Sequence, residues 1–171
     1  NLRGSGLLRL NLNDTDSSIK NYENASIAPN TWSGAEPYEV DNDPPPVTIS
    51  APSTTLTRSG PVTYTVSYEG AASISLAAKD ILLNKTGSAN GLVSVSGSGT
   101  VSRTVTISGI SGDGTLGIRI AAGTAVDARG NRSYAAGPSA VFMVDNTGPS
   151  AVLGTPSAAL TKSGPVSYTV T

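Results

Sequence analysis

Apolar and polar residues alternate along much of the chain, as they do in strands with one buried face. The clearest run is 62–68, where Val62, Tyr64, Val66 and Tyr68 alternate with threonine and serine. Shorter alternating runs occur at 73–76, 93–96, 104–108 and 115–120, with an edge strand at 47–50 and a last strand around 142–144. The pattern therefore predicts an all-β fold.

The spacing of these strands predicts their architecture. Glycine-rich turn signals separate them at Asn90-Gly91, Ser96–Gly99 and Ser111–Gly114, and Asp113 is expected in a hairpin. Residues 71–84 fit a strand, a turn at 79–80 and a short second strand, with a helical turn at 79–83 as the alternative. About seven such strands predict an immunoglobulin-like β-sandwich. Its predicted core contains Tyr64, Val66, Val105, Ile107, Leu116, Ile118 and Phe142.

The chain repeats itself. Residues 40–67 return as 144–171, always 104 positions later, with 15 of 28 residues identical. Near the N-terminus the pattern of Leu8 and Leu10 returns as Leu116 and Ile118, and 19–24 aligns with 126–131, which places Lys20 opposite Asp127. We therefore expect 1–42 to be the C-terminal part of one repeat, 43–146 a complete repeat of about 104 residues, and 147–171 the N-terminal strands of a following repeat.

Composition narrows the chemistry that the chain can perform. The 171 residues include no cysteine and no histidine, and 13% are charged with a net charge of -1. Catalytic triads, thiol nucleophiles and Cys/His zinc sites are thereby excluded, and the few carboxylates are scattered over turns and strand ends. We expect no enzymatic activity, no nucleic-acid partner and no membrane span in this segment.

Two short motifs support a family resemblance. A Val-Asp-x-Thr-x-Pro junction occurs at 144–149, and an Asp-x-x-Gly-Asn loop occurs at 127–131. In combination they resemble the bacterial immunoglobulin-like (Big-type) tandem repeats of large surface adhesins and extracellular fibres. The resemblance implies a structural stalk at the cell surface or in a secreted filament. Its partners would be neighbouring repeats of the same chain, and lateral self-association into a filament is a further expectation.

Oxygen ligands are the only metal ligands available, and they suit a hard cation such as calcium. The candidate ligands are Asp41, Asp43, Asp127 and Asp145, with Asn42 and Asn146 beside them. Thr147 at the place of Asp43, and Lys20 opposite Asp127, argue against a generic calcium array. The alternative is that these side chains form turns by bonding nearby backbone amides.

A carbohydrate- or protein-binding module is the alternative function. Trp32 lies in a loop with Tyr22 and Tyr38 near it in sequence, and exposed aromatic rings are common in sugar-binding sites. Alternatively, Trp32 covers one end of its own β-sandwich.

The sequences of the two junctions predict that they differ in stiffness. Pro44, Pro45 and Pro46 restrict the first junction, whereas Gly148-Pro149-Ser150 stands at the second. Because proline fixes φ and glycine does not, the first junction is expected to be the stiffer.

Overall fold

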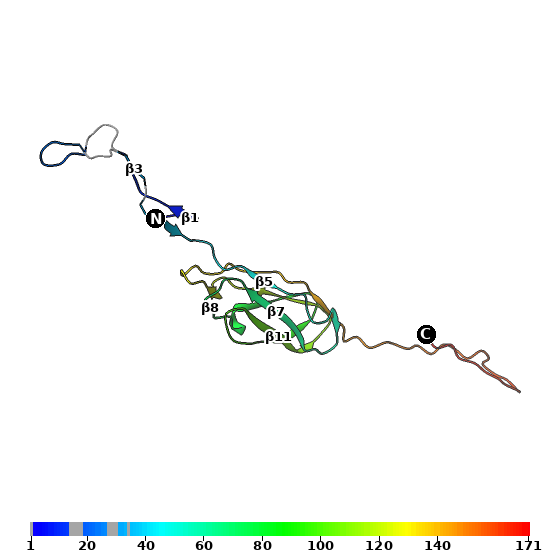
Figure 1. Ribbon diagram of the computed structural model, residues 1–171. Coiled ribbons are helices and arrows are strands. Elements are labelled where there is room, and N and C mark those ends of the chain that lie inside the picture. The colour runs from blue at the N-terminus through cyan, green and yellow to red at the C-terminus, as the bar shows by residue number, and fades with distance from the viewer. Residues whose placement is uncertain (1, 14–18, 27–30, 34) are drawn as a thin grey trace.

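The computed structural model describes residues 2–13, 19–26, 31–33 and 35–171. Its regular structure consists of β-strands and one short 3₁₀ helix, which confirms the all-β prediction. Figure 1 shows a compact β body in the middle of the chain, with an extended arm at each end. Within the described ranges no helix has the length and hydropathy needed to cross a membrane.

Two four-stranded sheets form the body. One sheet has the order β10-β11-β7-β5 and the other β6-β14-β12-β9; all neighbours are antiparallel except β14 and β6. A two-stranded sheet joins β8 and β13. The elements are β5 (Val47–Ile49), β6 (Leu56–Thr57), β7 (Val62–Tyr68), β8 (Ser73–Ile74), η1 (Ala78–Asp80), β9 (Ile81–Lys85), β10 (Asn90–Ser96), β11 (Ser102–Ser111), β12 (Gly114–Ile120), β13 (Ala125–Val126) and β14 (Phe142–Val144).

One core lies between the two sheets. All seven side chains predicted to be inside are buried, because the inward positions of β7 and β11 face those of β12 and β14. The rings of Tyr64 and Phe142 lie 6.5 Å apart, and the Tyr64 hydroxyl donates a 2.8 Å bond to the Ala140 carbonyl. Tyr68 and the buried Thr124 share a 2.9 Å hydrogen bond. The body is therefore an all-β, sandwich-like fold, and among the described residues each buried side-chain nitrogen or oxygen has a hydrogen-bond partner.

Three local expectations have different outcomes. The strand–turn–strand prediction for 71–84 is confirmed by β8, η1 and β9. The turn expected at Asn90-Gly91 lies instead at 87–88, and both residues belong to β10, where its register against β11 shifts. The prediction of Asp113 in a hairpin is wrong, because β11 and β12 belong to different sheets. This crossing packs closely on the 86–88 turn, since a Cβ on Gly112 would meet the Ser88 carbonyl.

The described part of the N-terminal arm contains four short strands: β1 (Gly6–Leu8), β2 (Asn11–Asn13), β3 (Thr31–Ser33) and β4 (Tyr38–Val40). β1 pairs with β4, and β2 pairs with β3. The register of β1 on β4 is that of β12 on β14, with pairs Gly6↔Val40 and Leu8↔Tyr38 in the arm and Gly114↔Val144 and Leu116↔Phe142 in the body.

The C-terminal arm has the register of β5 on β7. The bridge Leu153↔Val170 corresponds, 104 positions later, to the pair Ile49↔Val66. The Ser167 amide donates to the Ser157 hydroxyl at 3.0 Å, as the Thr63 amide does to the Ser53 hydroxyl at 3.0 Å.

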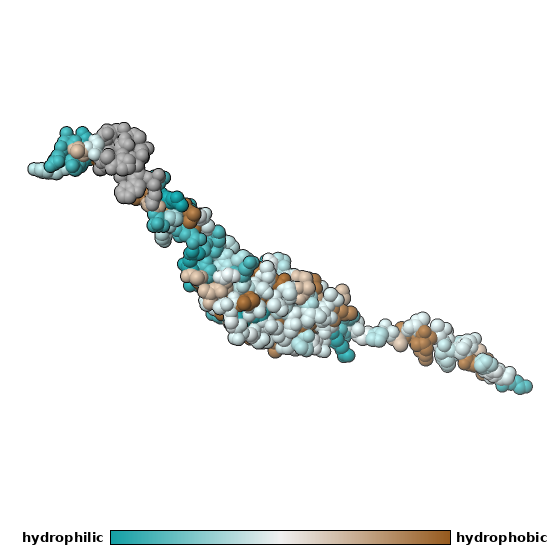
Figure 2. All heavy atoms as spheres, viewed as in Figure 1, coloured by the Kyte–Doolittle hydropathy of each residue, from teal (hydrophilic) through white to brown (hydrophobic). Residues whose placement is uncertain are grey.

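The arms differ from the body in burial. Val170 is 64% exposed, whereas Val66 is 0% exposed. Figure 2 shows hydrophobic side chains at the surface of the C-terminal arm. Each arm therefore carries apolar strand positions that no opposing sheet covers among the described residues.

Candidate functional site at the joint

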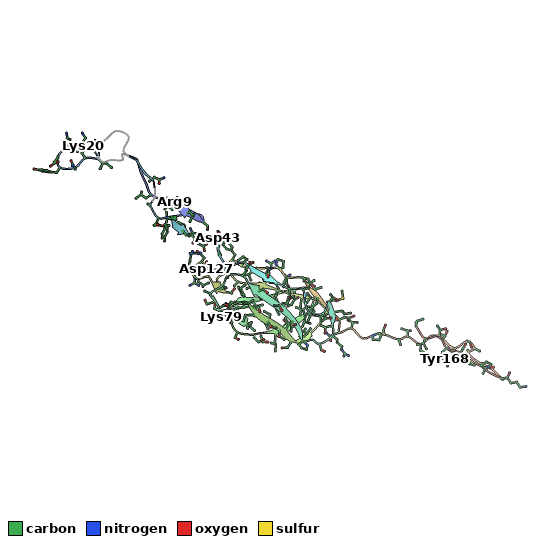
Figure 3. The ribbon with its side chains drawn as sticks, in the orientation of Figure 1. Arg9, Lys20, Asp43, Lys79, Asp127 and Tyr168 are labelled. Carbon is green, nitrogen blue, oxygen red and sulfur yellow. The ribbon has the colours of Figure 1, made fainter. Side chains whose placement is uncertain are left out.

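The joint between the N-terminal arm and the body contains an open cleft of about 620 Å³. Its walls come from the end of β4, the three prolines 44–46, the end of β7 and the loop after β13. In Figure 3 Asp43 and Asp127 lie close together at this end of the body. The acidic residues that line the cleft are Glu39, Asp41, Asp43, Glu69 and Asp127, and Arg129 is the one basic residue among the lining residues.

The loop after β13 is held by Asp127. One of its carboxylate oxygens, Oδ1, accepts the backbone N–H of Arg129 at 2.9 Å and that of Asn131 at 2.8 Å. The Asn131 side chain donates to the other oxygen, Oδ2, at 2.8 Å. These bonds, the one from the Asn131 side chain foremost, lower the pKa of Asp127 because they favour its ionised form. The loop is thus ordered independently of the arm.

Arg129 and Asn131 extend from this loop across the joint. The Arg129 guanidinium donates from Nη2 to Glu39 Oε2 at 2.7 Å and from Nη1 to Asp41 Oδ2 at 3.0 Å. The Asn131 Nδ2 donates to the Asp41 carbonyl oxygen at 3.1 Å. Glu39 and Asp41 are two residues apart at an extended strand end, so their side chains leave the same face and reach one guanidinium. Three hydrogen bonds therefore connect body and arm at one point.

The structure brings three of the four calcium candidates to this joint. Asp41, Asp43 and Asp127 line the cleft, and the Asp43 amide donates to Asp41 Oδ1 at 3.0 Å. Asp145 lies after β14 instead, where its Oδ1 accepts the Thr147 amide at 3.0 Å. All three of Asp41, Asp127 and Asp145 thus accept nearby amides as turn residues do.

The carboxylates of Asp41 and Asp127 have hydrogen-bond partners within the protein. Arg129 binds Asp41, and both oxygens of Asp127 accept hydrogen bonds from its own loop. Across 2–13, 19–26, 31–33 and 35–171 no group of three or more acidic residues is placed to hold a metal ion. Calcium binding stays a prediction.

An asparagine ties each linker to the two residues just before a strand of its own repeat, which is β12 in the body and β1 in the arm. The Asn146 Nδ2 donates to the Gly112 carbonyl at 2.7 Å, and its amide donates to Asp113 Oδ1 at 2.6 Å. At the other linker, the Asn42 Nδ2 donates to the Gly4 carbonyl at 2.7 Å and its amide donates to Ser5 Oγ at 3.0 Å. The contact is the same at both places, so the exit of the linker is fixed in the same way.

The structure corrects the alignment of the Asp127 loop with its earlier copy. The Asn21 Oδ1 accepts the amides of Glu23 at 3.0 Å and Ala25 at 2.9 Å, which are the bonds that Asp127 accepts from Arg129 and Asn131. Asn21, rather than Lys20, therefore takes the place of Asp127. Glu23 takes the place of Arg129, a change of charge that the sequence alignment did not reveal.

The predicted aromatic site is described only in part. Tyr22 is fully exposed and Tyr38 is exposed. The prediction that Trp32 lies in a loop is wrong, because Trp32 belongs to β3, which pairs with β2. The side chain of Trp32 lies outside the described part of the structure.

Comparison with protein-family models, with curated proteins and with solved structures finds no match to this chain.

Proposed function

We propose that the chain is a segment of an extracellular stalk or fibre of a bacterial surface protein, built from tandem immunoglobulin-like repeats. The main support for this proposal is that contacts found in the body recur in the arms on both sides of it. The β12–β14 register and the asparagine contact recur in the N-terminal arm, and the β5–β7 register recurs in the C-terminal arm. A chain that repeats one sandwich in series extends a distant domain from a surface.

The placement outside a bacterial cell rests on the resemblance to Big-type repeats. The joint adds support for a mechanical role, since hydrogen bonds and three consecutive prolines connect arm and body beside a cleft that is open to solvent. Neighbouring repeats of the same chain are the partners that this arrangement requires.

Single-molecule stretching tests the mechanical function. A tandem array of residues 43–146 should unfold in separate events of equal length. Each unit of 104 residues should release roughly 300–350 Å of contour, given at most about 3.6 Å per extended residue and the length of the folded unit. Extension without discrete events would contradict the proposal.

Lateral association is assigned to the edge strand β10. This strand is seven residues long, and from Thr86 to Ser102 the chain has no charged residue and no proline. Edge strands usually carry such residues because bare edges pair with other chains. Leu92, 72% exposed on β10, adds an apolar contact. Sedimentation of the chain and of Leu92→Lys tests this: association should be present in the first and weaker in the second, and equal association would exclude β10.

The binding-module alternative has the exposed Tyr22 and Tyr38 in its favour. A glycan array probed with the chain distinguishes the two functions, because saturable binding that Tyr38→Ala abolishes would favour the module over the stalk.

A further inference from the structure

We propose that Arg129 is an ionic clamp that fixes the orientation of the N-terminal arm on the body, and that this clamp is specific to this joint. The inference rests on the stalk function proposed above, because the orientation of a joint matters mechanically only in a rod.

In the clamp, one guanidinium group donates hydrogen bonds to two carboxylates. The Arg129 guanidinium bonds Glu39 within β4 and Asp41 just after it, through different nitrogens. Planar guanidinium groups suit such paired recognition because their donors are fixed relative to one another. Two anchor points on one strand end restrict its rotation, which a single contact would not do.

The Arg129 backbone is in place before the arm is bound. Its amide donates to Asp127 at 2.9 Å, and the same carboxylate holds the Asn131 amide at 2.8 Å. The loop therefore presents the guanidinium from a fixed base on the body, and little backbone ordering remains to be done when the carboxylates approach.

Prolines alone leave this joint with rotational freedom. Pro44, Pro45 and Pro46 fix their φ angles, but the ψ angles on either side of them can still change. The two ion pairs act on the arm before the prolines, so they restrict the movement that the prolines permit. The Asn131 bond to the Asp41 carbonyl, at 3.1 Å, holds the same strand end.

Two of the three clamp residues do not recur at their equivalent positions, whereas Asp41 recurs as Asp145. Glu23 occupies the place of Arg129 in the earlier loop, as the matching hydrogen bonds of Asn21 and Asp127 show. Met143 occupies the place of Glu39 before the second linker, because it holds the same position in the β12–β14 register. One loop position and one strand position thus set whether a joint is clamped by charge.

Pulsed electron–electron spin resonance on the full chain tests the clamp. The sequence has no cysteine, so Leu7→Cys on β1 and Thr65→Cys on β7 provide the only two labelling sites. Both positions are exposed. The parent chain should give a narrow distance distribution between the labels, and Arg129→Gln should widen it about twofold or more. Arg132→Gln is the matched control, since it removes an exposed arginine from the same loop and should leave the width unchanged.

A charge reversal separates ionic clamping from general damage. Arg129→Glu should widen the distribution, and Arg129→Glu combined with Glu39→Arg should narrow it again. About 1 M NaCl should widen the parent distribution but not that of Arg129→Gln, because the Debye length falls to about 3 Å.

The outcomes distinguish the clamp from the stalk. Equal narrow distributions for the parent and Arg129→Gln would overturn the clamp and leave the stalk proposal intact. A broad distribution in the parent would overturn the clamp and also count against a stiff stalk. Widening by Arg132→Gln as large as that by Arg129→Gln would likewise overturn the clamp.

Discussion

Truncation of Ile118 to alanine is the sharpest test of the fold, because the chain contains its own control. Ile118 lies on β12 and is 0% exposed, whereas Leu10, which aligns with it 108 positions earlier, is 80% exposed. The two side chains have the same number of carbon atoms. Ile118→Ala and Leu10→Ala therefore remove the same amount of apolar side chain from a core position and from a surface position.

The expected cost follows from burial. Removal of three buried carbon groups costs about 2.4 kcal/mol at roughly 0.8 kcal/mol each. The cavity left between the sheets adds to this, so Ile118→Ala should lower the free energy of unfolding by roughly 3–4 kcal/mol. For a body of this size that corresponds to a fall in Tm of about 10–20 °C. Leu10→Ala should change the free energy of unfolding by less than about 0.5 kcal/mol.

Urea unfolding of the full chain followed by circular dichroism measures both variants, with thermal melts as a second readout. A cost below about 1 kcal/mol for Ile118→Ala would show that β12 turns another face toward the core. Equal costs for the two variants would refute the assignment of the N-terminal arm as a strand pair without an opposing sheet.

The remaining predictions concern titration, the linker and metal ions. Burial raises the pKa of Tyr64 and Tyr68, so the stability from their neutral phenols is complete below about pH 10 and lost as the pH rises through the raised values; in a variant whose exposed tyrosines, Tyr22, Tyr38, Tyr134 and Tyr168, are replaced by phenylalanine, tyrosinate absorbance should appear together with unfolding, and ionisation before unfolding would contradict this. Hydrogen bonds lower the pKa of Asp127, so the order that its carboxylate gives the loop is present above about pH 4 and lost as the pH falls through the lowered value; Asp127→Ala should speed hydrogen exchange at the Asn131 amide severalfold at neutral pH, and unchanged exchange would refute the anchor. Asn146→Ala should lower the free energy of unfolding by about 0.5–1.5 kcal/mol in urea titrations, and no change would show that its bonds do not stabilise the body. Calcium followed by chelator should leave Tm unchanged; a rise with calcium that the chelator reverses would support the calcium prediction.

The alternation of apolar and polar residues predicted the core, because the buried face of a strand is determined by the residues of that strand alone. Every second residue of a strand faces the same side, so the run from Val62 to Tyr68 identifies its own inner face without any knowledge of its neighbours. All seven predicted core side chains are buried for this reason. The same alternation occurs in the arms, where Val170 remains exposed, because a pattern shows which face is apolar but not what covers it.

The crossing from β11 to β12 could not be predicted in this way. The stretch 111–114 has the glycine content of a hairpin turn, yet the strands on either side belong to different sheets. Sheet membership depends on contacts with strands far along the chain, such as β7 for β11 and β9 for β12. Asn90-Gly91 gave a false turn signal for a related reason, since a register shift within β10 accommodates the same two residues.

The joint was predicted as a cluster of acidic residues, and its basic residue was missed. Asp41, Asp43 and Asp127 drew attention through their shared chemistry, whereas Arg129 pairs with residues 88 and 90 positions away and has no local signal of its own. A comparison of the copies could have found it, because a change from Glu23 to Arg129 within an otherwise similar loop marks a position with a specific partner. The one-residue error in the alignment concealed that change.

Weak contacts are sufficient to orient a joint although they contribute little to the stability of a fold. The Arg129 pairs are partly exposed, with 48% of that side chain, 61% of Glu39 and 25% of Asp41 accessible. Each pair contributes about 0–1 kcal/mol at such exposure. The loss of one pair would hardly change the melting of a body whose free energy of unfolding is several kcal/mol. The same loss of about 1 kcal/mol changes the ratio of two joint orientations roughly fivefold. Arg129→Gln should therefore widen the distance distribution while leaving Tm almost unchanged. Ile118→Ala should lower Tm, but at temperatures where this variant is still folded its distance distribution should be as narrow as that of the parent. If the two variants instead changed Tm and joint width in proportion, orientation would depend on the stability of the body and not on the charge at its surface.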